Sequence, residues 1–231
     1  MPAINKTALV TGASGGIGYE LAKLFAHDHY NLAAPSAPEQ LFEQLRKDGI
    51  EIDVLVNNAA YGKFGPFADM PLEEVTGQIE LNIVGLTTVT RLFLPGMIAR
   101  KSGRILNVAS TAGFQPGPLM AVYYASKAYV LSFSEAIANE LKGSGVTVTC
   151  LCPGPTDTGF QGRAGVENSR LFQQFGPMDA KTVARDGYHA LMKGKTLTIS
   201  GFKNLLLAES VRVAPRKLAT AISRWVAEEK K

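Results

Sequence analysis

The sequence lacks several features that mark other classes of protein. Its two cysteines, Cys150 and Cys152, form no CxxC pair, so we expect buried strand residues in a reducing compartment rather than a redox motif. The three histidines, His27, His29 and His189, show no metal-ligand spacing, and no GxSxG element indicates a hydrolase. The net charge is +4, but no run of Lys and Arg predicts a nucleic-acid groove. We therefore expect no bound metal and no nucleic-acid partner.

Long apolar segments are also missing from the sequence. The first residues lead directly into a short strand, without the charged start or the apolar core of a signal peptide. No run of about 18 apolar residues predicts a membrane span. With 46% hydrophobic and 19% charged residues, the 231-residue chain has the composition of a soluble globular protein with room for one large α/β domain. We therefore expect a cytoplasmic protein whose residues 1–231 form a single domain.

Short apolar runs alternate with helical patterns along most of the chain. Alternating strands and helices predict a parallel sheet with right-handed crossovers and helices on both faces. The expected fold is a doubly wound Rossmann fold with three layers, α/β/α. The predicted strands cover residues 7–10, 31–34, 53–57, 104–108, 146–151 and 197–199, and the predicted helices cover 16–27, 38–47, 71–99, 121–142 and 179–193.

A glycine-rich turn joins the first predicted strand to the first predicted helix. It reads TGASGGIG over residues 11–18. Glycine permits tight turning and close backbone approach, and the amino end of a helix directs free N–H groups at an anion such as a pyrophosphate. Such a turn alone is weak evidence, because a plain structural turn has the same residues, but its place between strand and helix strengthens it. The residues expected to contact a cofactor here are Gly12, Ser14, Gly15, Gly16, Ile17 and Gly18.

Tyr123 and Lys127 form a second group of functional candidates. They are four residues apart, so in a helix both side chains would leave the same face. A free tyrosine has a pKa of about 10, and a nearby ammonium group should lower that pKa toward a value useful for proton transfer. Ser110 follows the strand at 104–108 and would stand at the carboxyl edge of the sheet, where open parallel sheets bind ligands. A tyrosine and a lysine one turn apart can also be an ordinary helix face, so the pair needs support from other residues.

These motifs, in this order and at this spacing, resemble the short-chain dehydrogenase/reductase family. Residues 11–18 match its Thr-Gly-x-x-x-Gly-x-Gly fingerprint, and Tyr123 and Lys127 match its Tyr-x-x-x-Lys pair. Ser110 lies 13 residues before Tyr123, as in the family. The resemblance covers about residues 6–201. The remaining matches are Asn57 to Ala60, where Ala60 replaces the family's glycine, Asn82 in the long helix, and Pro153 to Thr158, which fits Pro-Gly-x-x-x-Thr.

The resemblance implies an NAD(P)H-dependent oxidoreductase that reversibly reduces a ketone or aldehyde to an alcohol, and so acts on CH–OH groups. Tyr123 would donate a proton to the forming alkoxide, and Ser110 would hydrogen-bond the same oxygen. Lys127 would lower the pKa of the phenol and hold the nicotinamide ribose, while Asn82 would hold a water that relays protons to Lys127. The further cofactor contacts that the resemblance implies are Asn58, Ala59, Ala60, Pro153, Gly154, Thr156 and Thr158.

The sequence departs from the family between the first helix and Asp53. One strand–helix unit is missing there, so we expect six parallel strands, with the family's third strand lost. The missing part would carry the acidic or basic residue that selects NAD or NADP. Gly15 stands where NADP-dependent relatives often have a basic residue, and no acidic residue follows Leu32 closely. We therefore expect NADP rather than NAD as the cofactor.

The C-terminal half is expected to supply the substrate side. The segment 159–178, called the substrate loop below, and the segment 113–121 carry apolar side chains that indicate an apolar carbonyl or alcohol substrate. The tail, residues 202–231, has two helical patterns separated by Pro215. Packing on the body or on a partner subunit is the favoured role of the tail, and contact with an anionic membrane is the alternative. Because the family associates through its two long helices, a homodimer or homotetramer is expected.

Two other functions stay open on the sequence alone. A cofactor-binding or inactive relative that acts as a binding protein would account for the missing unit, although the complete Tyr123 and Lys127 pair argues against it. A sugar-nucleotide epimerase shares Tyr-x-x-x-Lys, but it usually has a Gly-x-x-Gly-x-x-Gly turn and a longer substrate domain. Oxidation of NADPH in the presence of carbonyl compounds would separate the reductase from the binding protein.

Overall fold

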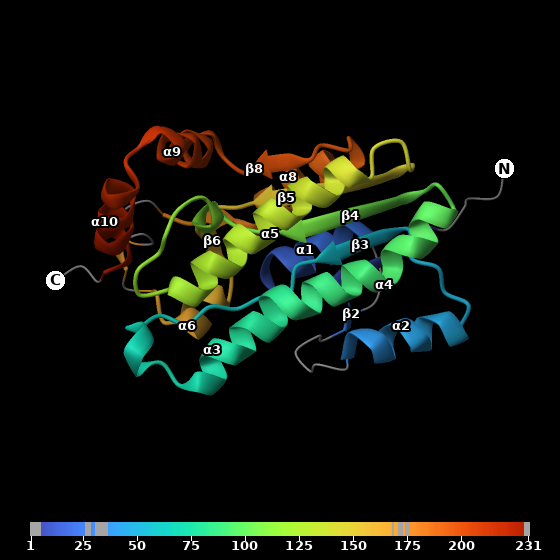
Figure 1. The fold of residues 1–231 in the computed structure, drawn as a ribbon, viewed down its shortest axis with the longest axis horizontal. Helices are drawn as coiled ribbons and strands as arrows, with labels where there is room; N and C mark the ends of the chain where they lie inside the picture. The colour runs from blue at the N-terminus through green and yellow to red at the C-terminus, as the bar shows by residue number, and fades with distance from the viewer. Residues whose placement is uncertain are drawn as a thin grey trace.

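The protein is built around one parallel sheet of six strands. The computed structural model describes residues 6–25, 29–30, 37–167, 169–170, 173 and 176–228. The strand order is β2-β1-β3-β4-β5-β8, and every neighbouring pair is parallel (Figure 1). The predicted doubly wound parallel sheet is thereby confirmed. The strands are β1 (Ala8–Thr11), β2 (His29–Tyr30), β3 (Val54–Asn57), β4 (Gly103–Val108), β5 (Val146–Cys152) and β8 (Leu197–Ile199).

The edge of the sheet beside β1 is short, as the missing strand–helix unit predicts. Its edge strand, β2, has two residues, and the chain then passes through α2 (Ala37–Lys47) to β3 on the other side of β1. Among the described residues no strand lies outside β2, so the family's third strand has no counterpart in this part of the chain. The strand predicted at 31–34 falls outside the described residues.

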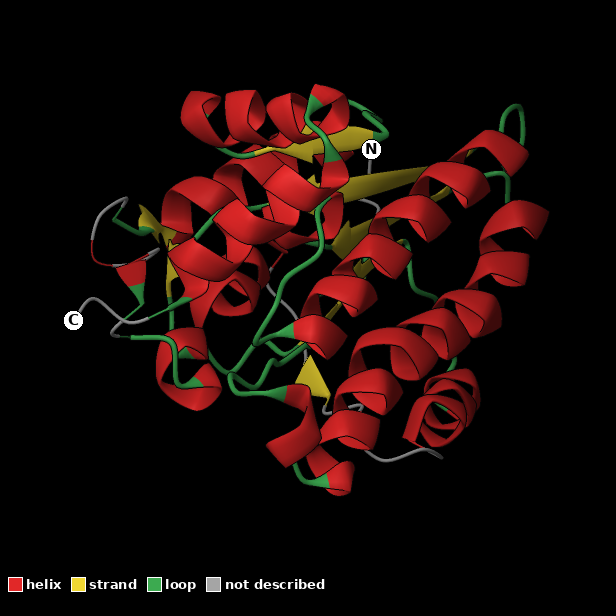
Figure 2. Ribbon diagram, turned by 60° about the vertical axis from the view of Figure 1, so that its left-hand side comes forward, coloured by secondary structure: helices red, strands yellow, loops and turns green. Residues whose placement is uncertain are grey.

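Helices cover both faces of the sheet, because each strand alternates its side chains between the two faces (Figure 1 and Figure 2). Leu9 and Leu55 point to the face covered by α2, α4 and α5. Val10 and Val56 point to the opposite face, which α1 and α8 cover. All four strand residues are buried, as expected for a sheet between two helix layers. These helices are α1 (Gly16–Phe25), α4 (Leu86–Ala99), α5 (Ala121–Glu140) and α8 (Ala180–Met192).

The long helix predicted at 71–99 is one helical run that changes its winding in the middle. It consists of α3 (Leu72–Ile79), a π-helical segment η2 (Glu80–Gly85) and α4. By length and composition, the run 72–99 could cross a membrane, so the expectation that the sequence has no such segment was wrong. Core helices pass the same test, and the inner side of α4 lies in the core, where Val89 and Met97 are fully buried.

The substrate loop contains more regular structure than a plain loop. The helix α6 (Phe160–Ala164) lies within it. At the end of the substrate loop, β7 (Met178–Asp179) pairs in parallel with β6 (Thr156–Asp157), and the two strands form a separate small sheet.

The tail forms the two helices that Pro215 was predicted to separate. They are α9 (Phe202–Val213) and α10 (Arg216–Ala227). Figure 1 shows both helices beyond the arrowheads of the central strands, at the carboxyl edge of the sheet. The tail therefore lies at the edge where a ligand of this fold is expected.

Candidate active site

Ser110 lies two residues after the end of β4, at the carboxyl edge of the sheet, and caps the amino end of η3 (Thr111–Phe114). Its hydroxyl oxygen accepts a hydrogen bond from the backbone N–H of Ala112 at 3.1 Å. The same hydroxyl donates to the carbonyl oxygen of Pro153 at 3.3 Å. These two bonds fix the serine between the end of β4 and the segment that follows β5, so its hydroxyl faces the space between them.

Lys127 is held behind this edge by burial and by one hydrogen bond. Its side chain is 4% exposed, and Nζ donates to the carbonyl oxygen of Val108 at 2.8 Å. Nζ lies 5.7 Å from the ring centroid of Tyr123. Burial lowers the pKa of Lys127 to about 8, although the neighbouring thiols of Cys150 and Cys152 act in the opposite direction. The lysine therefore still carries its charge at neutral pH and brings that charge to within reach of the phenol.

The phenol of Tyr123 has its pKa raised, chiefly because the neighbouring side chains partly desolvate it. A hydrogen bond with Ser110 lowers the pKa in part, and Tyr124 raises it further. The predicted net lowering by Lys127 is therefore wrong for this structure, since desolvation has the largest effect. The rings of Phe160 and Tyr124 contribute to this apolar environment, with centroids 5.1 and 6.1 Å from that of Tyr123. A phenol that stays protonated at neutral pH is suited to donate a proton.

Asn82 lies in the π-helical segment η2, and its side chain is 1% exposed. Its Oδ1 accepts from the N–H of Tyr61 at 3.1 Å, and its Nδ2 donates to the carbonyl of Tyr61 at 2.8 Å. Nδ2 also donates to Ser126 Oγ at 3.0 Å. Asn82 thus connects the loop after β3 to α5, and its partner on α5, Ser126, is the residue directly before Lys127. π-helical turns are frequent at functional sites, but the predicted proton relay through a water on Asn82 stays a prediction.

The glycine-rich turn is locked to the end of β3 by Thr11 and Asn58. Thr11 Oγ1 accepts from the N–H groups of Asn58 and Ala59, both at 3.0 Å. Asn58 Nδ2 donates to the carbonyls of Thr11 and Gly12 at 3.0 and 3.1 Å. Gly12 has φ +65°, and a Cβ there would stand 2.8 Å from the Cα of Ala59. The turn therefore needs glycine at this position. The turn leaves the amino end of α1 open toward the large cavity of the protein.

One cavity of about 1640 Å³ connects the glycine-rich turn with Ser110 and Tyr123. Two predicted site residues do not line it. Asn82 is buried and hydrogen-bonded to Ser126 of α5, and Gly18 packs under the turn, where a Cβ would collide with Gly12 and Asn58. The predicted residues that do line it are Gly12, Ser14, Gly15, Gly16, Ile17, Asn58, Ala59, Ala60, Ser110, Tyr123, Lys127, Pro153, Gly154, Thr156 and Thr158.

The cavity has the charge and the backbone shape that an NAD(P) dinucleotide requires. Among its described lining residues, Lys127, Arg163 and Lys203 are cationic, and no aspartate or glutamate is present. The turn between β1 and α1 offers backbone N–H groups to a pyrophosphate. Gly15 has open space where a Cβ would stand. These residues therefore fit a nicotinamide dinucleotide, NAD or NADP.

Sequence reasoning missed the contribution of the tail to this cavity. The helices α9 and α10 form one of its walls, although the tail was expected to pack on the body or on a partner subunit, with membrane contact as the alternative. Asn204 of α9 lies against Gly154, and its Nδ2 donates to the carbonyl of Ser200 at 2.8 Å. The amphipathic pattern of the tail was visible, but nothing in it tells a side that faces a cavity from one that faces the core. The tail residues that line the cavity include Leu207, Val211, Ala219, Ile222, Ser223 and Val226.

Comparisons with known proteins agree with this geometry. The profile of a family described as short chain dehydrogenase matches residues 29–168. The chain is 34% identical over 180 residues to the very-long-chain 3-oxoacyl-CoA reductase of Phaeosphaeria nodorum, which covers 62% of this chain and 53% of that protein. It is 36% identical over 187 residues to the monensin polyketide synthase putative ketoacyl reductase of Streptomyces virginiae, which covers 67% of this chain and 72% of that protein. The chain thus spans about half the length of the first of these relatives.

A solved structure shares nearly the whole fold. The short-chain dehydrogenase from Sphingobium yanoikuyae in complex with NADPH matches with a TM-score of 0.79 and 26% identity. The match covers 92% of this chain and 94% of that one. The short edge beside β1 therefore leaves the rest of the architecture in place.

Proposed function

The chain belongs to the short-chain dehydrogenase family, and from this premise we propose that it is an NAD(P)H-dependent reductase that reversibly converts a ketone or aldehyde into an alcohol. The observation that carries the proposal is the meeting of Ser110, Tyr123 and Lys127 at the wall of the cavity that the glycine-rich turn also lines. A nicotinamide bound in this cavity supplies the hydride. The side chains of the protein position the carbonyl and deliver the proton.

Tyr123 is the proton donor in this proposal. Its phenol is protonated at neutral pH, since an ordinary tyrosine pKa is about 10 and desolvation raises it further, so a proton is available when negative charge develops on the substrate oxygen. After the transfer, the ammonium group of Lys127 stabilises the phenolate across the 5.7 Å that separates Nζ from the ring centroid. Stabilising the phenolate is equivalent to lowering the pKa of the phenol, so the lysine acts against desolvation, which remains the larger effect in this structure.

Ser110 holds the substrate oxygen beside Tyr123. Its hydroxyl now donates to the carbonyl of Pro153 at 3.3 Å, which is long for a hydrogen bond between two oxygens. The hydroxyl can therefore turn toward a developing alkoxide with little loss of energy. The bond from the Ala112 N–H keeps the serine oxygen in place during this turn.

The proposed substrate is a 3-oxoacyl compound with an apolar chain. The names of the two curated relatives refer to 3-oxoacyl-CoA and to ketoacyl reduction. The cavity wall near Tyr123 is apolar, since Met120, Ala164 and Val166 pack there with Phe160. An acyl chain fits such a wall, whereas a sugar would leave its hydroxyl groups without partners.

The test of the proposed function is the consumption of NADH and NADPH with a panel of straight-chain ketones, aldehydes and 3-oxoacyl esters. We expect oxidation of the reduced cofactor with an equal amount of alcohol formed. Tight binding of the cofactor without any consumption across the whole panel would favour the alternative, a binding protein. The short edge at β2 is the observation that keeps this alternative in the test.

The cofactor preference is tested by Gly15→Arg. We propose NADP as the cofactor, and Gly15 has open space for a long side chain at the mouth of the glycine-rich turn. An arginine there is expected to tighten NADPH binding by about tenfold, because a hydrogen bond to a charged group contributes about 1.5 kcal/mol. Fluorescence titration with both cofactors measures the effect. Gly15→Gln is the neutral control, and an equal change for NADH and NADPH in the arginine variant would contradict the expectation.

A further inference from the structure

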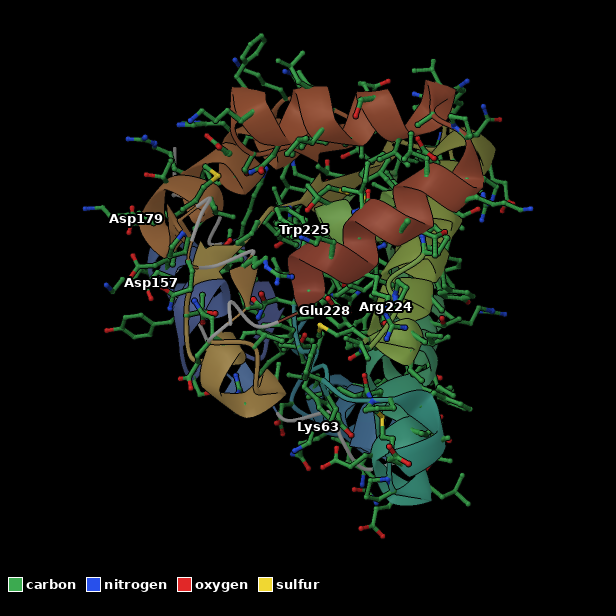
Figure 3. All side chains as sticks on the ribbon, turned by 90° about the vertical axis from the view of Figure 1, so that its left-hand side faces the viewer. Lys63, Asp157, Asp179, Arg224, Trp225 and Glu228 are labelled. Carbon is green, nitrogen blue, oxygen red and sulfur yellow. The ribbon has the colours of Figure 1, made fainter. Side chains whose placement is uncertain are left out.

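The cavity extends past Tyr123 into a chamber between α10 and the substrate loop. Its walls are mostly apolar, with Val166 and Phe160 on one side and Ile222 and Val226 of α10 on the other. Figure 3 looks onto this edge of the molecule, where α10, with Arg224 and Trp225 labelled, crosses the view. Mostly apolar ligand cavities carry a small number of polar groups that orient the ligand, so the role of the hydroxyl groups in this chamber calls for an explanation.

Two serine hydroxyls in this chamber have no hydrogen-bond partner among the described residues. They belong to Ser169 of the substrate loop and Ser223 of α10, which are 3% and 6% exposed. Both line the cavity. Ser223 lies close enough to the hydroxyl of Tyr124 to offset part of the rise that desolvation causes in the pKa of that phenol. A buried hydroxyl without a partner costs free energy, so two of them in one chamber indicate groups that a ligand satisfies.

The two serines come from segments that are fixed to each other. Arg170, next to Ser169, donates from its backbone N–H to the carbonyl of Glu228 at 3.1 Å. Its Nη1 donates to the carbonyl of Trp225 at 2.8 Å and lies 3.6 Å from the carboxylate of Glu228. Its guanidinium group also stands over the ring of Trp225, 5.1 Å from the centroid. The substrate loop and the end of α10 are therefore joined, and the joint holds Ser169 and Ser223 beside one space.

We infer that Ser169 and Ser223 form a second oxygen-binding subsite, which holds the acyl carbonyl of an ester or thioester while the ketone of the same molecule lies at Tyr123. Two O–H donors match the two lone pairs of one carbonyl oxygen. In a 3-oxoacyl compound one methylene group separates the two carbonyl carbons, and the proximity of Ser223 to Tyr124, the residue after Tyr123, agrees with this short separation. This inference rests on the proposed function, and it names the substrate feature that the tail recognises.

The experiment compares straight-chain oxo esters, in which the position of the ketone varies, with straight-chain ketones of equal length. For the wild type, we expect kcat/KM for at least one oxo ester to exceed that of its matched ketone by about tenfold, the effect of two ordinary hydrogen bonds. The double variant Ser169→Ala with Ser223→Ala should lose this preference while it keeps the rate with the simple ketones. Ser200→Ala is the matched control, since Ser200 is 1% exposed and its hydroxyl also lacks a partner, but it does not line the cavity.

The possible failures can be told apart. If the wild type reduces neither kind of compound, the proposed function fails. If it reduces both kinds equally, or if the double variant keeps the preference, the subsite is overturned and the reductase stands. Thermal unfolding without substrate gives a second readout that does not depend on activity: the double variant should be about as stable as the wild type, because the contact of Ser223 with the Tyr124 hydroxyl is the one polar contact of the two hydroxyls that is removed among the described residues. A large loss of stability would show that the hydroxyls serve the fold and would also overturn the subsite.

Discussion

A Tyr123→Phe variant is expected to reduce carbonyl compounds about 10²–10⁴ times more slowly than the wild type, which is the usual contribution of a positioned general acid. The change removes one oxygen and keeps the ring, so the contacts with Phe160 and Tyr124 remain. Ser110 loses its hydrogen bond with the phenol, but Ser110 and Lys127 stay in place through their hydrogen bonds to Pro153 and Val108. The loss should fall on kcat, and the affinity for the cofactor should change little. Stopped-flow measurement of cofactor oxidation at saturating cofactor would separate the two quantities.

Tyr129→Phe is the control for this variant. Tyr129 lies on the same helix, and its hydroxyl is 2.9 Å from that of Thr87, outside the cavity. Removing it should lower the free energy of unfolding by about 1 kcal/mol, the usual value of one hydrogen bond, and leave kcat unchanged. If Tyr123→Phe kept a rate similar to that of Tyr129→Phe, the proton would have to come from another group.

The catalytic residues could be predicted from the sequence because their signals are local. The Tyr123 and Lys127 pair depends on a spacing of one helical turn, and Ser110 on its place directly after a strand. The glycine-rich turn could be predicted for the same reason. Its backbone needs a positive φ at Gly12, +65°, and the glycine at that single position indicates this requirement in the sequence. The short edge beside β1 was also predictable, because a missing strand–helix unit changes the spacing of the motifs that remain.

The features that could not be predicted depend on residues far apart in the chain. The raised pKa of Tyr123 comes from desolvation by its surroundings, which include the ring of Phe160 from the substrate loop. The π-helical turn at Asn82 leaves the apolar pattern of the long helix nearly unchanged, so periodicity predicts one regular helix. The role of α10 as a wall of the cavity depends on its anchorage to Arg170, a contact across 55 residues of sequence.

A Lys127→Met variant is expected to lose activity by about 10²–10³ and, at the same time, to become more stable. The loss of activity follows from the loss of the only buried cation beside the phenol among the described residues. The gain in stability follows from burial, which lowers the pKa of Lys127 from 10.5 to about 8. One pKa unit corresponds to about 1.4 kcal/mol, so the buried ammonium group destabilises the folded state by up to about 3 kcal/mol at neutral pH. The lost hydrogen bond to the Val108 carbonyl offsets about 1 kcal/mol of the gain.

The pH dependence of this stability difference identifies its cause. Below the folded-state pKa of about 8, Lys127 is charged in both the folded and the unfolded protein, and the full penalty is present. Between about pH 8 and 10.5, the unfolded chain binds more protons than the folded one, so the wild type gains stability relative to the variant as the pH rises. Denaturant unfolding of both proteins without cofactor, at pH 7 and at pH 10, should therefore show a difference that shrinks at the higher pH. Lys142→Met, which removes an exposed lysine just after α5, is the control. A difference that stays constant with pH would attribute the added stability to side-chain packing instead of to the buried charge.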